Sequence, residues 1–92
     1  MPRGINHRRL DYAEVTVTLN GSGAGETAVT FVEDYVSTPD ILVGQNEADE
    51  DGGAIYRVKS GTATKDGFTL EVTGSARVSQ NIVVQYVALE KD

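Results

Sequence analysis

Hydrophobic and polar residues alternate along most of this chain, and a period of two residues is typical of β-strands. Between residues 12 and 19, for example, Val15, Val17 and Leu19 share one face of the segment. The same pattern predicts six strands, at residues 12–19, 26–32, 41–45, 54–60, 68–73 and 80–89. No segment has the i, i+3, i+4 apolar spacing of an amphipathic helix, so the pattern predicts an all-β domain.

Short polar and glycine-rich segments separate these strands. Residues 20–25 and 74–79 are expected to be loops, and Lys65-Asp66-Gly67 contains the Asp-Gly pair of a tight hairpin turn. Six short strands cannot cover both faces of a single sheet. The expected architecture is therefore a six-stranded antiparallel β-sandwich, with two sheets packed face to face.

The last strand is apolar on both of its faces. One face carries Ile82, Val84, Tyr86 and Ala88, and the other carries Val83, Val87 and Leu89. A strand of this kind must be covered on both sides, and only one side can meet its own core. We predict that Val83, Val87 and Leu89 form a subunit interface with a second copy. The alternative is that the strand lies in mid-sheet beneath a loop.

The length of 92 residues fits one domain, residues 11–92, preceded by an extended N-terminal arm, residues 1–10. A domain this small buries only about 60–65% of the surface that its unfolded chain exposes. Disulfides, metals or self-association often add stability at this size. The chain has no Cys and a single His, His7, so self-association is the remaining common route.

The arm is basic although the chain as a whole is acidic. Arg3, Arg8 and Arg9 lie in the arm without any acid, whereas the whole chain has 14 acidic residues and a net charge of −6. We predict that Arg3, His7, Arg8 and Arg9 dock on an acidic partner surface, the alternative being a frayed terminus. The acidic body should repel nucleic acid. It would also stay soluble in high salt, so a halophilic source is a further hypothesis.

Candidate sites for chemistry are few. The acidic residues Glu47, Asp49, Glu50 and Asp51 precede two glycines, but their spacing does not match the calcium-binding EF-hand loop. A solvated loop is therefore preferred to a Ca²⁺ site, and no cofactor is predicted. Serines have no base nearby except His7 in the arm, so no catalytic site is predicted and the chain is not expected to be an enzyme.

The sequence also bears on where the chain is made. No apolar run approaches the length of about 18 residues that a membrane-spanning helix needs. The N-terminal sequence MPRGINHRRL lacks the apolar stretch of a signal peptide. We therefore expect synthesis as a soluble intracellular product with no membrane partner.

Several short motifs carry a family resemblance over residues 27–89. They are Val29-Thr-Phe31, Tyr35, Pro39-Asp-Ile-Leu-Val43, Gly67-Phe68-Thr-Leu70 and Val83-Val-Gln-Tyr-Val-Ala88. With these motifs the chain resembles the H-type lectin domain and related small sandwich domains of tailed-virus structural proteins. The resemblance implies a six-stranded antiparallel sandwich that associates as a trimer.

The resemblance also implies a sugar site. Lectins of this family hold a galactose-type sugar in clefts between subunits, with contacts from the loop before the last strand. The positions carried over onto this chain are Arg77, Gln80 and Asn81. The chain has no Trp, however, and sugar recognition usually uses an aromatic face, which argues against this function.

Two functions remain as hypotheses. The first is a non-enzymatic structural protein of a virion, made in the host cytoplasm, which decorates a capsid or tail protein through its arm. The second is a module of a fibre or adhesion protein that binds a host-surface glycan or receptor.

Overall fold

Six β-strands form in the part of the chain that the structure describes, residues 9–45 and 53–91 of a computed structural model. In chain order they are β1 (Leu10–Thr18), β2 (Gly25–Thr30), β3 (Asp40–Gln45), β4 (Ile55–Val58), β5 (Gly67–Thr73) and β6 (Asn81–Leu89). No helix occurs among these residues, so the predicted all-β class is confirmed.

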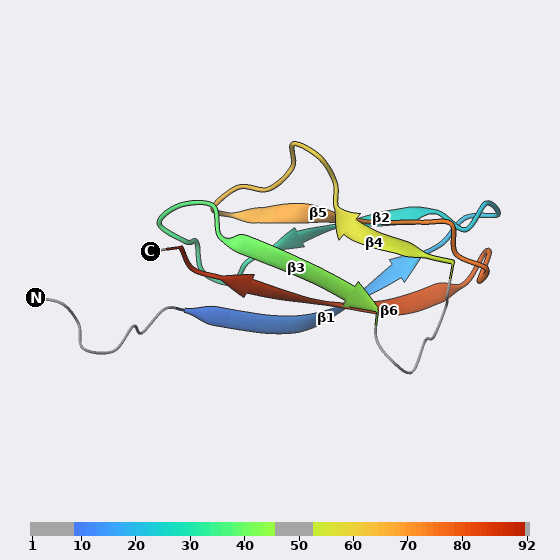
Figure 1. Cartoon of the computed structure of the whole chain (residues 1–92), viewed down its shortest axis with the longest axis horizontal. Helices are drawn as coiled ribbons and strands as arrows, with labels where there is room; N and C mark the ends of the chain where they lie inside the picture. The colour runs from blue at the N-terminus through green and yellow to red at the C-terminus, as the bar shows by residue number, and fades with distance from the viewer. Residues whose placement is uncertain (1–8, 46–52, 92) are drawn as a thin grey trace, which may run out of the picture.

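The strands form two three-stranded sheets, with the orders β1-β6-β3 and β2-β5-β4. Every pairing is antiparallel, as the predicted sandwich requires. Figure 1 shows the two layers, with the edge strands β1 and β2 belonging to opposite sheets. The last strand, β6, is the middle strand of its sheet.

The core lies between the two sheets and is built by the inward-facing residues of each strand. Val17, Leu70, Val72, Val84 and Ala88 are completely buried. Phe31, Tyr35, Phe68 and Tyr86 fill one end of the core with aromatic rings, whose centroids are 5.0–6.4 Å apart. The period-two pattern therefore identified the inward faces of β1 and β6 correctly.

The strand boundaries differ modestly from those predicted. β1 begins two residues early, at Leu10, because its backbone pairs with β6 as far as Leu89. β2 ends at Thr30 instead of Val32, because the chain turns there and leaves Val32 fully exposed. β4 ends at Val58, where residues 59–62 form a turn containing Gly61 with a φ of +79°.

Candidate functional site

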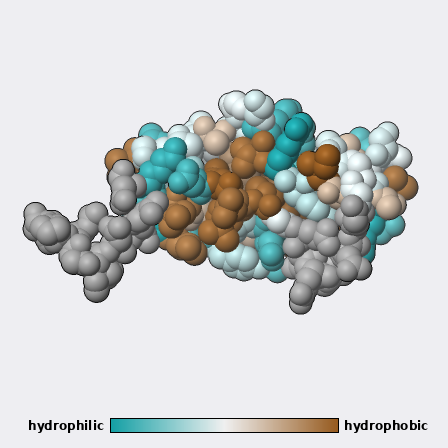
Figure 2. Space-filling view, viewed as in Figure 1, coloured by the Kyte–Doolittle hydropathy of each residue, from teal (hydrophilic) through white to brown (hydrophobic). Residues whose placement is uncertain are grey.

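The outward face of the β1-β6-β3 sheet carries an apolar surface three strands wide. In the strand register, Leu10 of β1 lies opposite Leu89 of β6. Val87 of β6 lies between Tyr12 of β1 and Leu42 of β3. The exposed fractions of Leu10, Tyr12 and Leu42 are 59%, 55% and 73%. We call this surface the outer apolar face and define it as Leu10, Tyr12, Leu42, Val83, Val87 and Leu89. Figure 2 shows apolar side chains gathered where β3 and β6 lie.

The predicted interface residues Val83, Val87 and Leu89 all point outward from β6 into this face. Each is half-buried. Val87 and Leu89 lie between residues of β1 and β3, and Val83 lies opposite Thr16 of β1. The sequence pattern found these three residues but not Leu10, Tyr12 and Leu42. Their contribution depends on which strands flank β6, and that pairing is not visible in the chain order.

A shallow hollow of about 180 Å³ indents the outer apolar face between Tyr12, Leu42, Gly44 and Val87. Gly44 creates it, since a β-carbon at this position would meet no atom within 4 Å. The Tyr12 hydroxyl donates a hydrogen bond of 2.9 Å to Gln85 Oε1, which holds the ring at the margin of the hollow. The hollow can therefore accept an apolar side chain from another molecule.

The outward face of the other sheet is polar by contrast. Cross-strand ion pairs lie on it, with Arg57 Nε 2.7 Å from Glu71 Oε1 and Lys59 Nζ 3.1 Å from Glu26 Oε2. The large hydrophobic residue exposed on this face is Ile55, at the start of β4. The two faces of the sandwich therefore differ in character, and only the β1-β6-β3 side presents an extended apolar surface among the described residues.

The loops that join β1 to β2 and β5 to β6 meet at one end of the sandwich. Backbone hydrogen bonds connect them, from Ser75 N to Gly23 O (3.0 Å) and from Ser79 N to Asn20 O (2.9 Å). Gly23 has a φ of +77°, and a β-carbon there would collide with the Ser75 carbonyl. This close approach requires glycine and fixes the two loops against each other.

The residues predicted to bind sugar, Arg77, Gln80 and Asn81, all lie at this loop end. Gln80 and Asn81 are exposed, and Arg77 is half-buried. The Thr18 hydroxyl donates to Asn81 Oδ1 over 2.8 Å, so this amide oxygen is already engaged by β1. The structure places the three residues in one region, and their role in binding stays a prediction.

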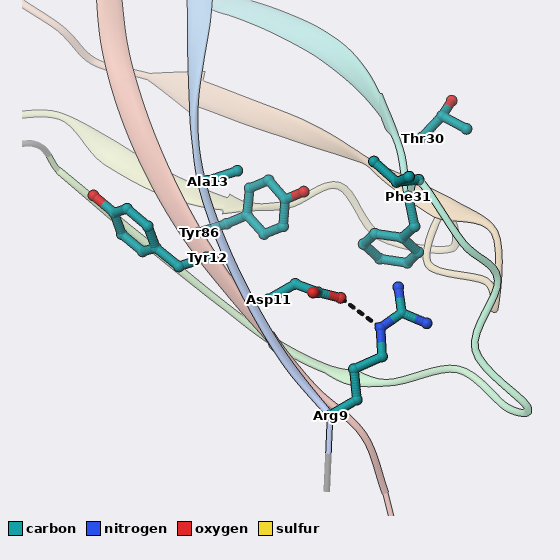
Figure 3. Close-up of a pocket in the computed structure, with 8 residues that line it drawn as sticks. Arg9, Asp11, Tyr12, Ala13, Thr30, Phe31 and Tyr86 are labelled. Atoms are coloured by element: carbon teal, nitrogen blue, oxygen red, sulfur yellow. Dashed lines mark hydrogen bonds and ion pairs between the residues drawn. The ribbon is translucent and has the colours of Figure 1, made fainter.

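At the opposite end, Arg9 joins the start of β1 to the turn that follows β2. Its Nε donates to Asp11 Oδ2 (2.8 Å), its Nη1 to the Asp34 carbonyl (3.2 Å) and its Nη2 to the Glu33 carbonyl (2.6 Å). The guanidinium carbon lies 3.8 Å from the centroid of the Tyr35 ring, a cation–π contact. We call Arg9, Asp11 and Tyr35 the Arg9 clasp (Figure 3 shows Arg9 and Asp11).

The pKa values of the clasp reflect these contacts. The Tyr35 hydroxyl donates a short hydrogen bond to Asp11 Oδ2, and this bond, with the Arg9 guanidinium, lowers the pKa of the Asp11 carboxyl. Burial and the same hydrogen bond raise the pKa of Tyr35 to about 12. At neutral pH the carboxylate is thus ionised and the phenol is neutral, which are the states that the hydrogen bonds require.

Much of the predicted arm lies outside the described residues. This applies to Arg3, His7 and Arg8, and also to the acidic residues Glu47, Asp49, Glu50 and Asp51. Arg9 is described, and it contacts its own domain through the clasp, so the structure gives it a local role that the sequence did not suggest. Docking of a partner by the arm stays a prediction.

Residues 9–45 and 53–91 contain no group of three potential metal ligands. The same residues contain no helix that is long and apolar enough to cross a membrane.

Three solved structures share this fold at low sequence identity. They are the R1 pyocin fibre of P. aeruginosa (TM-score 0.62, 13% identity), the tailspike protein gp49 of Pseudomonas phage LKA1 (0.58, 19%) and the tailspike gp61 of Pseudomonas phage phi297 (0.53, 13%). Each match covers 89–91% of this chain but only 14–23% of the other chain. The chain therefore corresponds to one domain of each longer protein.

Sequence comparison gives the family. No curated protein sequence matches this chain significantly. The model of the H-type lectin domain matches residues 26–89, most of the two-sheet sandwich and all of the motifs from Val29 to Ala88. The chain is therefore a member of the H-type lectin domain family.

Proposed function

We propose that this domain is a non-enzymatic structural module of a virus particle that assembles as a homo-oligomer, specifically a trimer, through its outer apolar face. The outer apolar face is the observation that carries the proposal. We favour a position in the tail over one on the capsid, because the similar folds come from a pyocin fibre and two phage tailspikes.

The difference in polarity between the outward faces of the two sheets supports assembly through the outer apolar face. Removing Leu10, Leu42 and Val87 from water would be favourable, at about 25 cal/mol per Å² of apolar surface. Burying the opposite face would instead remove the Arg57–Glu71 and Lys59–Glu26 ion pairs from water, which carries a desolvation cost. A second copy therefore gains most by covering the β1-β6-β3 sheet.

Measurement of molar mass tests the oligomer. Light scattering should give three times the chain mass of 9.8 kDa for the wild type. Leu42→Glu places a charge on the outer apolar face and should yield monomers. Ile55→Glu is the matched control, because Ile55 is similarly exposed (58%) but lies on the other sheet, and it should leave the mass unchanged. A monomeric wild type, or equal effects of the two variants, would contradict the proposal.

We further propose that the basic arm docks the oligomer on another virion protein. The contacts of Arg9 in the clasp determine where a test deletion of the arm should end. Arg9 belongs to the fold, so the deletion should stop at residue 8 and leave Arg9 in place. A chain lacking residues 1–8 should fold and assemble as the wild type does, yet fail to enter particles. Normal incorporation of this variant would rule out docking by the arm.

The second candidate function is recognition of a host-surface glycan or receptor. Family membership and the exposure of Gln80 and Asn81 at the loop end favour it. A glycan array probed with the wild type and with Arg77→Ala and Gln80→Ala variants tests it. Binding that both substitutions abolish would support the function, whereas an array without hits would count against it.

A further inference from the structure

The loop that joins β1 to β2 begins with the pair Asn20-Gly21. Asn20 is the one asparagine in the sequence that a glycine follows. Because glycine has no side chain, its backbone nitrogen can approach the side-chain amide of the preceding asparagine with little steric hindrance. Figure 1 shows this loop at the end of the sandwich where the loop between β5 and β6 also lies.

The side-chain amide of Asn20 is held by the backbone of its own loop. Its Oδ1 accepts hydrogen bonds from Ser22 N (2.8 Å) and from Ala24 N (3.1 Å). Two N–H donors on one carbonyl oxygen stabilise the negative charge that develops there when a nucleophile attacks the carbon. The loop therefore polarises the Asn20 amide for attack at Cγ.

The backbone nitrogen of Gly21 is the nucleophile within reach along the chain. Among residues 9–45 and 53–91, no group accepts a hydrogen bond from it, so no such contact must break before it reacts. Asn20 and Gly21 are both exposed, and a β-carbon at position 21 would meet no atom within 4 Å. Water can therefore take up the proton that Gly21 N releases, and ammonia can leave freely.

We propose that Asn20 is a site of spontaneous deamidation in the folded domain. Gly21 N loses its proton and forms a bond to Asn20 Cγ, while the bond from Cγ to Nδ2 breaks and Nδ2 leaves as ammonia. The product is a five-membered succinimide ring. Water then opens the ring at one of its two carbonyl carbons, which gives aspartate or isoaspartate at position 20. Water is the co-reactant, and nothing is oxidised or reduced.

The same residue also connects the two loops at this end through its backbone. The Asn20 carbonyl accepts hydrogen bonds from Gly23 N (3.1 Å) and from Ser79 N (2.9 Å). In isoaspartate the chain continues through Cγ, so this carbonyl becomes part of a free carboxylate and the backbone gains one carbon atom. Modification should therefore loosen the loop between β1 and β2 from the loop that carries Ser79, Arg77 and Gln80.

Ageing of the folded chain tests the reaction. The wild type is incubated at neutral pH and 37 °C and cut after glutamate, which releases residues 15–26 with Asn20 as their single asparagine. Mass spectrometry detects the exchange of NH₂ for OH, and isoaspartyl methyltransferase labels isoaspartate. A synthetic peptide of residues 15–26 is the unfolded reference. Deamidation in the folded chain should be at least as fast as in the peptide, because the peptide lacks the fixed N–H donors.

Gly21→Ala is the variant that blocks the nucleophile. The added methyl group meets no atom within 4 Å, so the fold should be kept. It hinders the approach of the backbone nitrogen and should slow deamidation about tenfold, a barrier increase of about 1.4 kcal/mol. Slower reaction in the folded wild type than in the peptide, or equal rates for the wild type and Gly21→Ala, would overturn the proposal.

Hydrogen exchange tests the structural consequence. The isoaspartate form carries an added negative charge and can be separated from the unmodified chain by ion exchange. Its Ser79 amide should exchange faster than in the unmodified chain, since the acceptor at position 20 has changed. The Lys59 amide is the control, because it donates to the Thr69 carbonyl (2.8 Å) away from these loops and should not change. Unaltered exchange at Ser79 would refute the loosening.

Discussion

At the scale of single residues, the Arg9 clasp shows how one side chain can close an end of the sandwich. The guanidinium stacks on Tyr35, bonds to Asp11 and reaches two carbonyls of the turn after β2. Arginine suits this position because its planar fork donates in several directions at once, which a lysine ammonium on its flexible stem does not reproduce. The clasp thereby ties the first strand of one sheet to the turn that extends from the other.

Stability should respond to alkaline pH through Tyr35. Its pKa in the folded state is about 12, above the ordinary value of 10.0, so the folded state prefers the neutral phenol. The stabilisation from this preference is complete below about pH 10 and is lost as the pH rises toward 12. The difference in unfolding free energy between the wild type and Tyr35→Phe should shrink over this window. Urea titrations at several pH values measure it, and a constant difference would contradict the role given to the clasp.

Acid should act on the clasp through Asp11. Its folded pKa lies below the ordinary 3.8, so its contribution is present above this value and is lost as the pH falls below it. Asp11→Asn should therefore lower the unfolding free energy at neutral pH. Between neutral pH and pH 3, this variant should lose less stability than the wild type loses. Thermal unfolding followed at neutral pH and near pH 3 compares the two chains. Equal acid sensitivity would show that Asp11 does not carry this effect.

At the scale of elements, β6 divides its side chains between two environments. Ile82, Val84 and Ala88 fill the core, whereas Val83 and Val87 face outward. From Val84 to Leu89 the strand pairs with β1 on one edge and with β3 on the other, so its outward side chains are what remains available for contact there. The apolar side chains on the outward side of β6 therefore form part of a sheet face, and they do not mark an unpaired edge strand.

Shortening a leucine to alanine should cost more stability in the core than on the surface. Leu70→Ala removes a completely buried side chain and should lower the unfolding free energy by about 2–5 kcal/mol. Leu42→Ala removes a side chain that is 73% exposed and should change the stability of the monomer by less than about 0.5 kcal/mol. Urea unfolding at low protein concentration measures both. A large loss for Leu42→Ala under these conditions would show that it packs within its own subunit.

The sequence predicted the strands well because alternation of apolar and polar residues is local information. All six strands were found, along with the inward faces of β1 and β6. It did not predict that Tyr35, in a turn, is buried, since its contacts with Arg9 and Asp11 join segments far apart in the sequence. Nor did it reveal that Leu42 lies beside Val87 in an apolar surface, because that follows from which strands lie side by side.

At the scale of the whole molecule, the charge balance sets how the domain behaves in salt. The chain carries a net charge of −6, and its ion pairs lie mostly at the exposed surface. Surface pairs of this kind contribute little, so repulsion among excess carboxylates is the larger effect. The halophilic source inferred from composition stays a prediction.

Stability should rise with salt. Increasing the salt to about 1 M shortens the screening distance to about 3 Å and weakens repulsion between carboxylates. The midpoint of thermal unfolding should therefore increase between dilute buffer and 1 M KCl. Calorimetry at both concentrations measures the shift, and a midpoint that falls with salt would argue against both the electrostatic account and a halophilic origin.

Contact between copies at the β1-β6-β3 sheet is the central proposal at this scale. Isotope-filtered NMR of a mixture of ¹³C-labelled and unlabelled chains detects such contact directly, because it records only proximities between different molecules. Intermolecular signals are expected from the methyl groups of Leu10, Leu42 and Val87. Absence of intermolecular signals, or signals from Ile55 on the opposite sheet instead, would contradict it.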